Sequence, residues 1–216
     1  AFFMIFALVV LPAIAIFDLG GLISMISKLQ SISPALVDPF SLSFGAFIGF
    51  LGIGLGSPGN PHILVRYMSI KRPEDFKFAA LVGTFWNVVM GWAAIYIGMA
   101  GRALFLVKEK LPGADTENLF PYMAQNYLHP IVFGIIIAAI LAAIMSTADS
   151  MLLVSASSVI RDIYQKILNP QKELSQKQMV TYSRIIIFLL VMVAFLFGII
   201  AKDLVFWLVL FAWGGL

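Results

Sequence analysis

Residues 52–62 read Gly52-Ile53-Gly54-Leu55-Gly56-Ser57-Pro58-Gly59-Asn60-Pro61-His62, inside a longer apolar stretch. Four of these eleven residues are glycine and two are proline. Each proline lacks a backbone donor and its ring clashes with the preceding turn, so a regular helix cannot run through the stretch. If the stretch lies in a membrane, the released backbone groups need protein or a water-filled cavity around them.

Two structures are compatible with this stretch. In the first, Gly52 and Gly56 form a face for close packing and a proline kinks a continuous helix. In the second, the helix is discontinuous, which is a recurring device of secondary transporters for exposing backbone groups to a substrate. A kink needs only one proline, so we favour the discontinuous helix. The break at Gly56–Asn60 is then predicted to line a solute cavity.

The composition is that of a membrane protein. Hydrophobic residues make up 61% of the 216 residues, charged residues 12%, and the mean hydropathy is +0.99; a soluble domain carries about twice that charge. The net charge of +3 comes from short connections between apolar runs, so it does not indicate nucleic-acid binding. The chain has no cysteine and only two distant histidines, His62 and His129, which argues against a zinc site.

Apolar runs of spanning length recur along the chain, and crossing the hydrocarbon takes about 20 residues. The sequence predicts an all-α polytopic membrane protein, a single transmembrane domain (residues 1–216) with about five full spans and one incomplete span. An amphipathic helix at 21–30 and a short helix at 120–126 are expected between spans. Both ends of the chain fall inside apolar runs, so we expect an internal piece of a longer protein. The predicted spans are residues 1–17, 41–66, 76–106, 131–160, 179–200 and 204–216.

Basic residues are distributed unevenly over the two sides of the predicted membrane. The connections after the second and fourth spans hold nine of them, against five on the other side. By the positive-inside rule these two connections are cytoplasmic, and the first span runs outward. The nine residues are Arg66, Lys71, Arg72, Lys77, Arg161, Lys166, Lys172, Lys177 and Arg184.

The fourth predicted span carries an oxygen-bearing face. Ser146 and Thr147 follow Ala143 by three and four residues, so the three residues share one side of a helix. Two hydroxyl oxygens and the Ala143 carbonyl suit a hard cation, although another helix would have to complete its shell. The alternative is that both hydroxyls bond back to carbonyls one turn earlier. From the residues alone, that alternative is the stronger interpretation.

Asp149 and Ser150 follow directly on the same predicted span. A carboxylate inside a membrane is costly and is a functional hypothesis by default. Its alternative is position, since Asp149 lies close enough to Arg161 to reach a water-filled cytoplasmic vestibule. Nothing in the chain is typical of a catalytic triad, a phosphate-binding loop or a dinucleotide-binding motif, so we do not expect an enzyme.

Four stretches of the chain resemble the sodium:solute symporter family, and within it sodium/proline symporters: Gly59–Met68, Leu141–Ser150, Leu152–Val154 and Val159–Tyr164. The resemblance extends over nearly the whole chain in the same order. It implies a leucine-transporter-like fold of two inverted repeats, of which this chain holds a part. Na+ is then the coupling ion.

In the family, a carbonyl and two hydroxyls of one core helix bind sodium, and the resemblance assigns those roles to Ala143, Ser146 and Thr147. It implies that the remaining sodium ligands come from an unwound helix outside this chain. It also suggests a second sodium site near Asp149 and Ser150. No other metal is implied.

The sequence differs from sodium/proline symporters at two positions of the predicted solute cavity. Those symporters carry aromatic residues where this chain has Ile53 and Ser57, beside Gly56 and Asn60. The solute is therefore left open among proline, another amino acid, a carboxylate, pantothenate and a sugar.

The leading hypothesis is sodium-coupled symport of a small organic solute by alternating access, in the cell membrane. The expected partners are the solute, the lipid bilayer and the remaining helices of the longer protein. A solute-sensing domain of a signalling protein is the alternative, and a purely structural membrane subunit is a third hypothesis.

Overall fold

The computed structural model describes residues 2–105, 111–170, 174–200 and 205–214. Every regular element in these ranges is helical. The chain divides into two compact units: unit 1 comprises Ala1–Gly52 with Ile70–Ala143, and unit 2 comprises Ile53–Ser69 with Ile144–Leu216. Two helices, α3 (Phe44–Gly56) and α7 (Pro130–Ser158), pass from one unit into the other.

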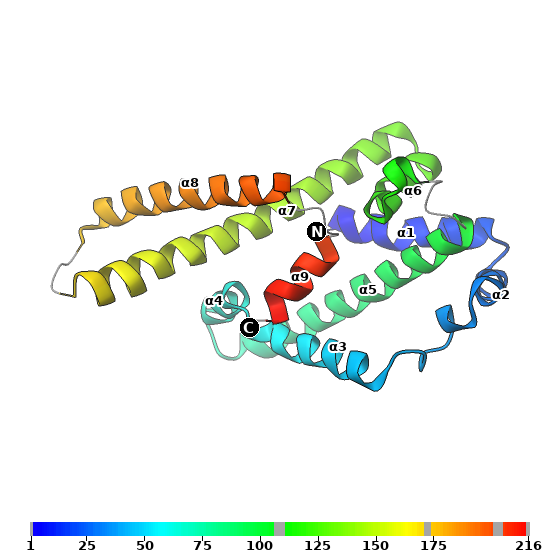
Figure 1. Cartoon of the computed structure of the whole chain (residues 1–216), viewed down its shortest axis with the longest axis horizontal. Helices are drawn as coiled ribbons and strands as arrows, with labels where there is room; N and C mark the ends of the chain where they lie inside the picture. Colours follow the sequence, from blue (N-terminus) through cyan, green and yellow to red (C-terminus); the bar gives the residue numbers. More distant parts are fainter. Residues whose placement is uncertain (1, 106–110, 171–173, 201–204, 215–216) are drawn as a thin grey trace. The chain divides into compact units, whose positions relative to one another are not determined.

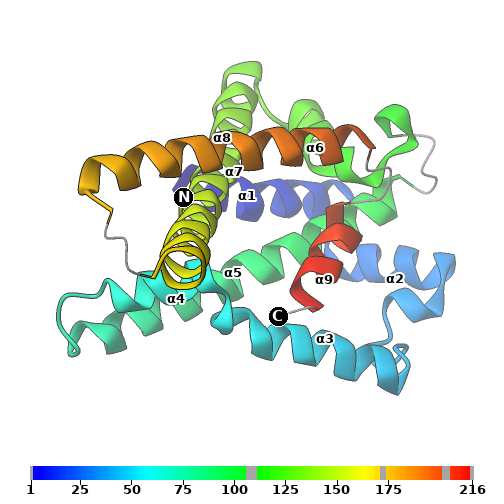
Figure 2. The same cartoon turned by 60° about the vertical axis from the view of Figure 1, so that its left-hand side comes forward.

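Unit 1 is built around two helices that lie side by side, α1 (Phe2–Asp18) and α5 (Asp75–Leu104), as both overall views show (Figures 1 and 2). The shorter helices α2 (Leu22–Ile32) and α6 (Leu119–Tyr127) pack against this pair. Apolar residues at helical spacing on all four helices form the core. Its buried members are Leu11, Ala15, Leu19, Met25, Leu29, Ile97, Ala100, Ala103, Met123 and Ala124.

The two short helices of unit 1 match the sequence prediction. The expected amphipathic helix at 21–30 is α2, which buries Met25 and Leu29. The expected helix at 120–126 is α6. A bend of 78° separates α1 from α2, and it turns on Gly20 (φ 84°) and Gly21 (φ 99°, ψ 174°). The Gly21 conformation is one that residues other than glycine essentially never adopt.

A hydrogen bond joins the last residues of α1 and α6 in unit 1. The Tyr127 hydroxyl at the end of α6 donates to Asp18 Oδ2 at the end of α1, over 2.9 Å. Burial, the hydrogen bond to Asp18 and the negative charge of that carboxylate, in that order, raise the pKa of Tyr127 to about 12. The neutral phenol is therefore the form that the fold favours.

Unit 2 contains α4 (Pro61–Met68), the second half of α7, α8 (Gln176–Ile200) and α9 (Val205–Gly214). A π-helical segment, η6 (Val159–Leu168), extends α7 directly, and its last turn is closed by the Asn169 amide donating to the Tyr164 carbonyl over 2.9 Å. Helical backbone therefore continues to Leu168, past residue 160 where the fourth span is predicted to end. The bounds of that span stay a prediction. The charged residues of η6 lie on exposed positions, while Ile160 of the same segment is buried.

Among the described residues, three helices are long and apolar enough to cross a membrane: Asp75–Leu104, the combined Pro130–Leu168 and Gln176–Ile200. The bent pair α1 and α2 gives a fourth if it counts as one span, and α3 with its extension is shorter. At most 6% of the residues in the apolar windows of these three helices are buried, as expected for surfaces that lipid or other helices cover. The predicted number of spans and the inverted-repeat arrangement stay predictions.

Candidate functional site

The predicted break in the second apolar stretch is present. The helix α3 ends at Gly56, a single 3₁₀ turn follows at Ser57–Gly59, and α4 begins at Pro61. Asn60 between them has φ −57° and ψ 130°, which is not helical. A residue before proline is disfavoured in the helical region, and the Pro61 ring requires no donor at the first position of a helix. Pro58 and Pro61 therefore separate two helices instead of kinking one.

Asn60 organises this break. It is the one buried polar side chain among the described residues, with 4% of its surface exposed. Its side-chain Nδ2 and its backbone amide both donate to the Ser57 carbonyl, over 3.0 Å and 3.2 Å. Its own carbonyl accepts from the amides of Ile63 and Leu64, each at 2.9 Å. Asn60 thus closes the turn behind it and starts the helix in front of it.

The four residues predicted to line a solute cavity occupy the break and the turn before it. Ile53 and Ser57 are half-buried, Gly56 is exposed and Asn60 is buried. They follow one another along unit 2, so the structure keeps them together. Asn60 is committed to backbone contacts there, a role that the sequence pattern did not indicate.

The predicted sodium-binding residues lie on one uninterrupted helix. Ala143, Ser146 and Thr147 all belong to α7, and their spacing places them on one face of it. Ser146 and Thr147 are exposed and Ala143 is half-buried. Two neutral hydroxyls and a carbonyl are the kind of oxygen ligands that a hard cation prefers. The described residues hold no group of three or more His, Cys, Asp or Glu side chains that would bind another metal.

The hydroxyl of Ser150, one turn further along α7, both donates and accepts a hydrogen bond. It donates to the Ser146 carbonyl over 2.9 Å, the back-bonding expected of serine in such helices. It also accepts from Arg66 Nη2 of α4 over 3.2 Å. The neighbouring Asp149 is exposed. The structure therefore brings Arg66 to the place where the sequence suggested a second sodium site.

Arg66 is the residue that the sequence analysis missed at this site, because it counted only as one of the basic residues that orient the chain. Arg66 and Ser150 are 84 residues apart, and no spacing rule pairs residues at that separation. The available signal was the position of Arg66 in the last turn of the short helix after the break.

A cavity of about 420 Å³ lies beside this contact, within unit 2. Val65 of α4 contributes to it, next to Arg66, and the other lining residues come from the end of α7 and from η6. Lys166 and Asp162 form an exposed ion pair of 2.7 Å at its rim. The remaining lining residues are Leu153, Val154, Ser157, Ser158 and Arg161.

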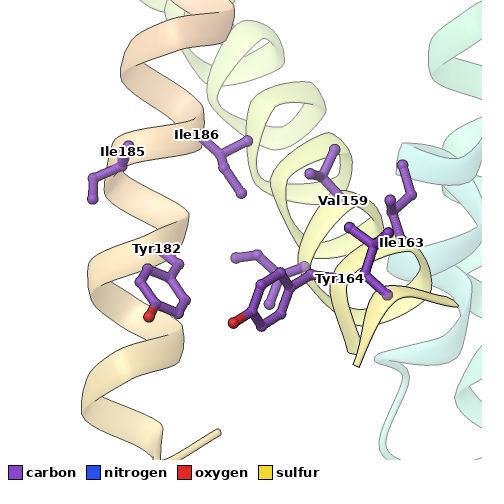
Figure 3. A pocket seen from close by; sticks show the side chains of 8 residues that line it. Val159, Ile163, Tyr164, Tyr182, Ile185 and Ile186 are labelled. Carbon is purple, nitrogen blue, oxygen red and sulfur yellow. The ribbon is translucent and has the colours of Figure 1, made fainter. Parts of the chain in front are cut away.

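A second cavity in unit 2, of about 380 Å³, is almost entirely apolar and lies between η6 and α8. Figure 3 shows Tyr164 and Tyr182 reaching across it with their hydroxyl groups on the same side. Their rings meet edge to face with centroids 5.9 Å apart. This tyrosine pair joins the π-helical segment to α8, and such aromatic contacts contribute about 0.5–1.5 kcal/mol beyond their buried area.

An interrupted apolar helix and a long apolar helix with an oxygen-bearing face are features that helical membrane proteins of the secondary-transporter kind share. The chain belongs to the sodium:solute symporter family, whose model matches residues 1–216. This confirms the family resemblance and the membrane location.

Several curated relatives are transporters of proline. The chain is 36% identical over 214 residues to a sodium/proline symporter of Staphylococcus aureus, covering 98% of this chain and 42% of the relative. It is 34% identical over 216 residues to the sodium/proline symporter of Escherichia coli (strain K12), covering 98% and 43%. It is 33% identical over 210 residues to the osmoregulated proline transporter OpuE of Bacillus subtilis (strain 168), covering 97% and 42%.

The chain thus spans less than half the length of these relatives. No solved structure gives a significant match.

Proposed function

We propose that the whole protein couples the entry of sodium to the uptake of a small organic solute by alternating access. The observation that carries this proposal is the match of the symporter family over the entire chain. The interrupted helix supports it, because a break of this kind exposes backbone groups and helix ends to a solute. We also propose the leucine-transporter-like inverted-repeat fold for the whole protein, with this chain as about five full spans and one incomplete span.

Sodium is proposed to bind at the Ala143 carbonyl and the Ser146 and Thr147 hydroxyls. The support is their common face on α7 and the hard, neutral character of the three oxygens. Three oxygens leave a sodium shell incomplete, so other helices of the whole protein are proposed to supply the rest. When bound, the ion would supply a positive charge beside the solute site, and its movement down its gradient would drive the uptake of the solute. A second site at Asp149 and Ser150 is proposed only for a state in which Arg66 has left Ser150.

Ile53, Gly56, Ser57 and Asn60 are proposed to line the solute cavity. Proline is the first solute to test, because the relatives named above transport it. The aliphatic Ile53 and the small Ser57 stand where sodium/proline symporters carry aromatic residues. A weaker preference for proline than for another small amino acid or carboxylate would follow from that difference.

The test uses the whole protein reconstituted into liposomes. Uptake of labelled proline is measured under an inward sodium gradient and under a matched potassium gradient, with unlabelled amino acids, pantothenate and sugars as competitors. The proposal expects uptake of at least one solute only with sodium. Equal uptake in both gradients would contradict sodium coupling, and solute binding without uptake would favour the sensing alternative.

A further inference from the structure

Arg66 and Ser150 connect the short helix after the break to the helix of the proposed sodium site. Arg66 Nη2 donates to Ser150 Oγ over 3.2 Å, and Ser150 Oγ donates onward to the Ser146 carbonyl over 2.9 Å. Both contacts lie within unit 2. Two consecutive hydrogen bonds therefore link the Arg66 guanidinium on α4 to the turn of α7 that carries Ser146.

This contact lies between the proposed sodium site and a cavity. Along α7, Ser146 and Thr147 precede Ser150 by about one turn, and Leu153 and Ser157 follow it by about one and two turns. Leu153 and Ser157 line the cavity of about 420 Å³, as does Val65, the neighbour of Arg66. The basic residues assign this end of α7 to the cytoplasmic side.

A guanidinium at Ser150 and a sodium ion at the same level of α7 exclude each other. The guanidinium of Arg66 is a cation, and it already donates to the Ser150 oxygen that a departing ion would need. Like charges at contact distance repel, and more strongly where water is scarce. Passage of an ion past Ser150 therefore requires Arg66 to withdraw.

We propose that the hydrogen bond between Arg66 and Ser150 is a latch that separates the sodium-binding turn from the cytoplasmic cavity. Arg66 acts here as a positioning residue: it holds α4 against α7 and binds neither sodium nor solute. The latch must open for sodium to leave toward the cytoplasm. This inference rests on the proposed symport function.

The latch is tested by the accessibility of the cavity below it. Ser157→Cys places a single thiol on the cavity lining of a chain that has no cysteine of its own. Any cysteine elsewhere in the whole protein is replaced first. A membrane-impermeant thiol reagent is applied to the outer face of right-side-out vesicles, so that it reaches the cavity only past the latch. Gln176→Cys, at the exposed start of α8, is the matched control site.

Arg66→Gln and Ser150→Ala are each expected to speed labelling of Ser157→Cys about fivefold, the effect of about one lost hydrogen bond. The double variant is expected to label no faster than either single variant, because both remove the same contact. Ser150→Thr keeps the hydroxyl and is expected to keep the slow rate. Labelling of Gln176→Cys is expected to stay constant throughout.

Unchanged labelling of Ser157→Cys in Ser150→Ala would overturn the latch, and so would rate increases that multiply in the double variant. Ser150→Ala decides the matter on its own if Arg66→Gln fails to fold. Sodium-dependent uptake is measured in the same vesicles. Sodium-dependent uptake with unchanged labelling rejects the latch alone, whereas uptake that ignores sodium rejects the proposed function and the latch together.

Discussion

Gly101 of α5 lies directly against the side chain of Leu119 at the start of α6. A Cβ atom at position 101 would stand 2.5 Å from Leu119 Cδ2 and 2.6 Å from Cδ1. Ala100 and Ala103 beside it are buried as well, so a stripe of small residues lets α6 approach α5 closely. This approach fixes the short helix that also carries Tyr127.

Gly101→Ala is expected to give a free energy of unfolding about 1 kcal/mol lower than Gly98→Ala does, because the added methyl group displaces the end of the Leu119 side chain. The measurement is thermal unfolding of the whole protein in detergent. Gly98→Ala, on the same helix with no atom of the described residues within 4 Å of the added Cβ, is the matched control. It should raise the free energy of unfolding by up to about 1 kcal/mol, because alanine favours a helix over glycine. Leu119→Ala should recover part of the loss in Gly101→Ala; a loss that is simply additive would contradict the contact.

Gly21→Ala is expected to destabilise the bend between α1 and α2 by about 1–3 kcal/mol. The added side chain meets open space, so the whole cost arises from the backbone conformation, φ 99° and ψ 174°. Gly45→Ala in α3 also meets open space but has no such φ, and it serves as the control. Equal melting temperatures for the Gly21 and Gly45 variants would show that the bend does not need glycine.

The Tyr127 phenol is expected to ionise near pH 12, two units above its ordinary value of 10.0. Since the pKa in the folded protein is raised, the hydrogen bond to Asp18 stabilises the fold fully below pH 10 and is lost as the pH rises through 12. The difference in phenolate absorbance between the wild type and Tyr127→Phe reports this titration.

Asp18→Asn should move the pKa of Tyr127 only part of the way back to 10, because burial, the largest cause of the rise, remains. A Tyr127 that ionises near pH 10 in the wild type would contradict the Tyr127–Asp18 hydrogen bond.

Asn60→Ala is expected to destabilise the break by about 1–3 kcal/mol, because it removes a buried amide that donates to Ser57. Asn126→Ala removes a similar side-chain bond, Nδ2 to the Tyr122 carbonyl at 2.8 Å, from an exposed position. This control should cost clearly less. The melting temperatures of the two variants compare the two sites, and equal losses would contradict the organising role of Asn60.

Much of the helical layout could be predicted from sequence, because it depends on local chemistry. Two prolines and four glycines at 52–62 were enough to predict the break, and amphipathic spacing was enough for α2 and α6. The continuation of α7 into a π-helical segment was not predictable in the same way. Arg161 and Lys166 were predicted to belong to the connection after the fourth span, and they lie on exposed positions of that segment, which continues to Leu168.

Some features of the candidate site likewise follow from local spacing, and others depend on the packing of distant segments. The shared face of Ala143, Ser146 and Thr147 follows from helical spacing alone. The bond between Arg66 and Ser150 joins two elements that are distant in the sequence, so its existence depends on packing that no local pattern records. The same holds for Gly101 and Leu119, where the glycine has meaning only through its neighbour on another helix.

Sodium dependence of uptake in variants of α7 tests the central claim most directly. Ser146→Ala and Thr147→Ala each remove one proposed oxygen ligand, while Ser155→Ala removes a hydroxyl from the opposite side of the same helix from Ser146. The sodium concentration for half-maximal uptake is expected to rise about tenfold or more in the first two variants, since an interaction with a charge contributes about 1.5–3 kcal/mol. It should stay unchanged in Ser155→Ala. Wild-type sodium dependence in both Ser146→Ala and Thr147→Ala would contradict the account.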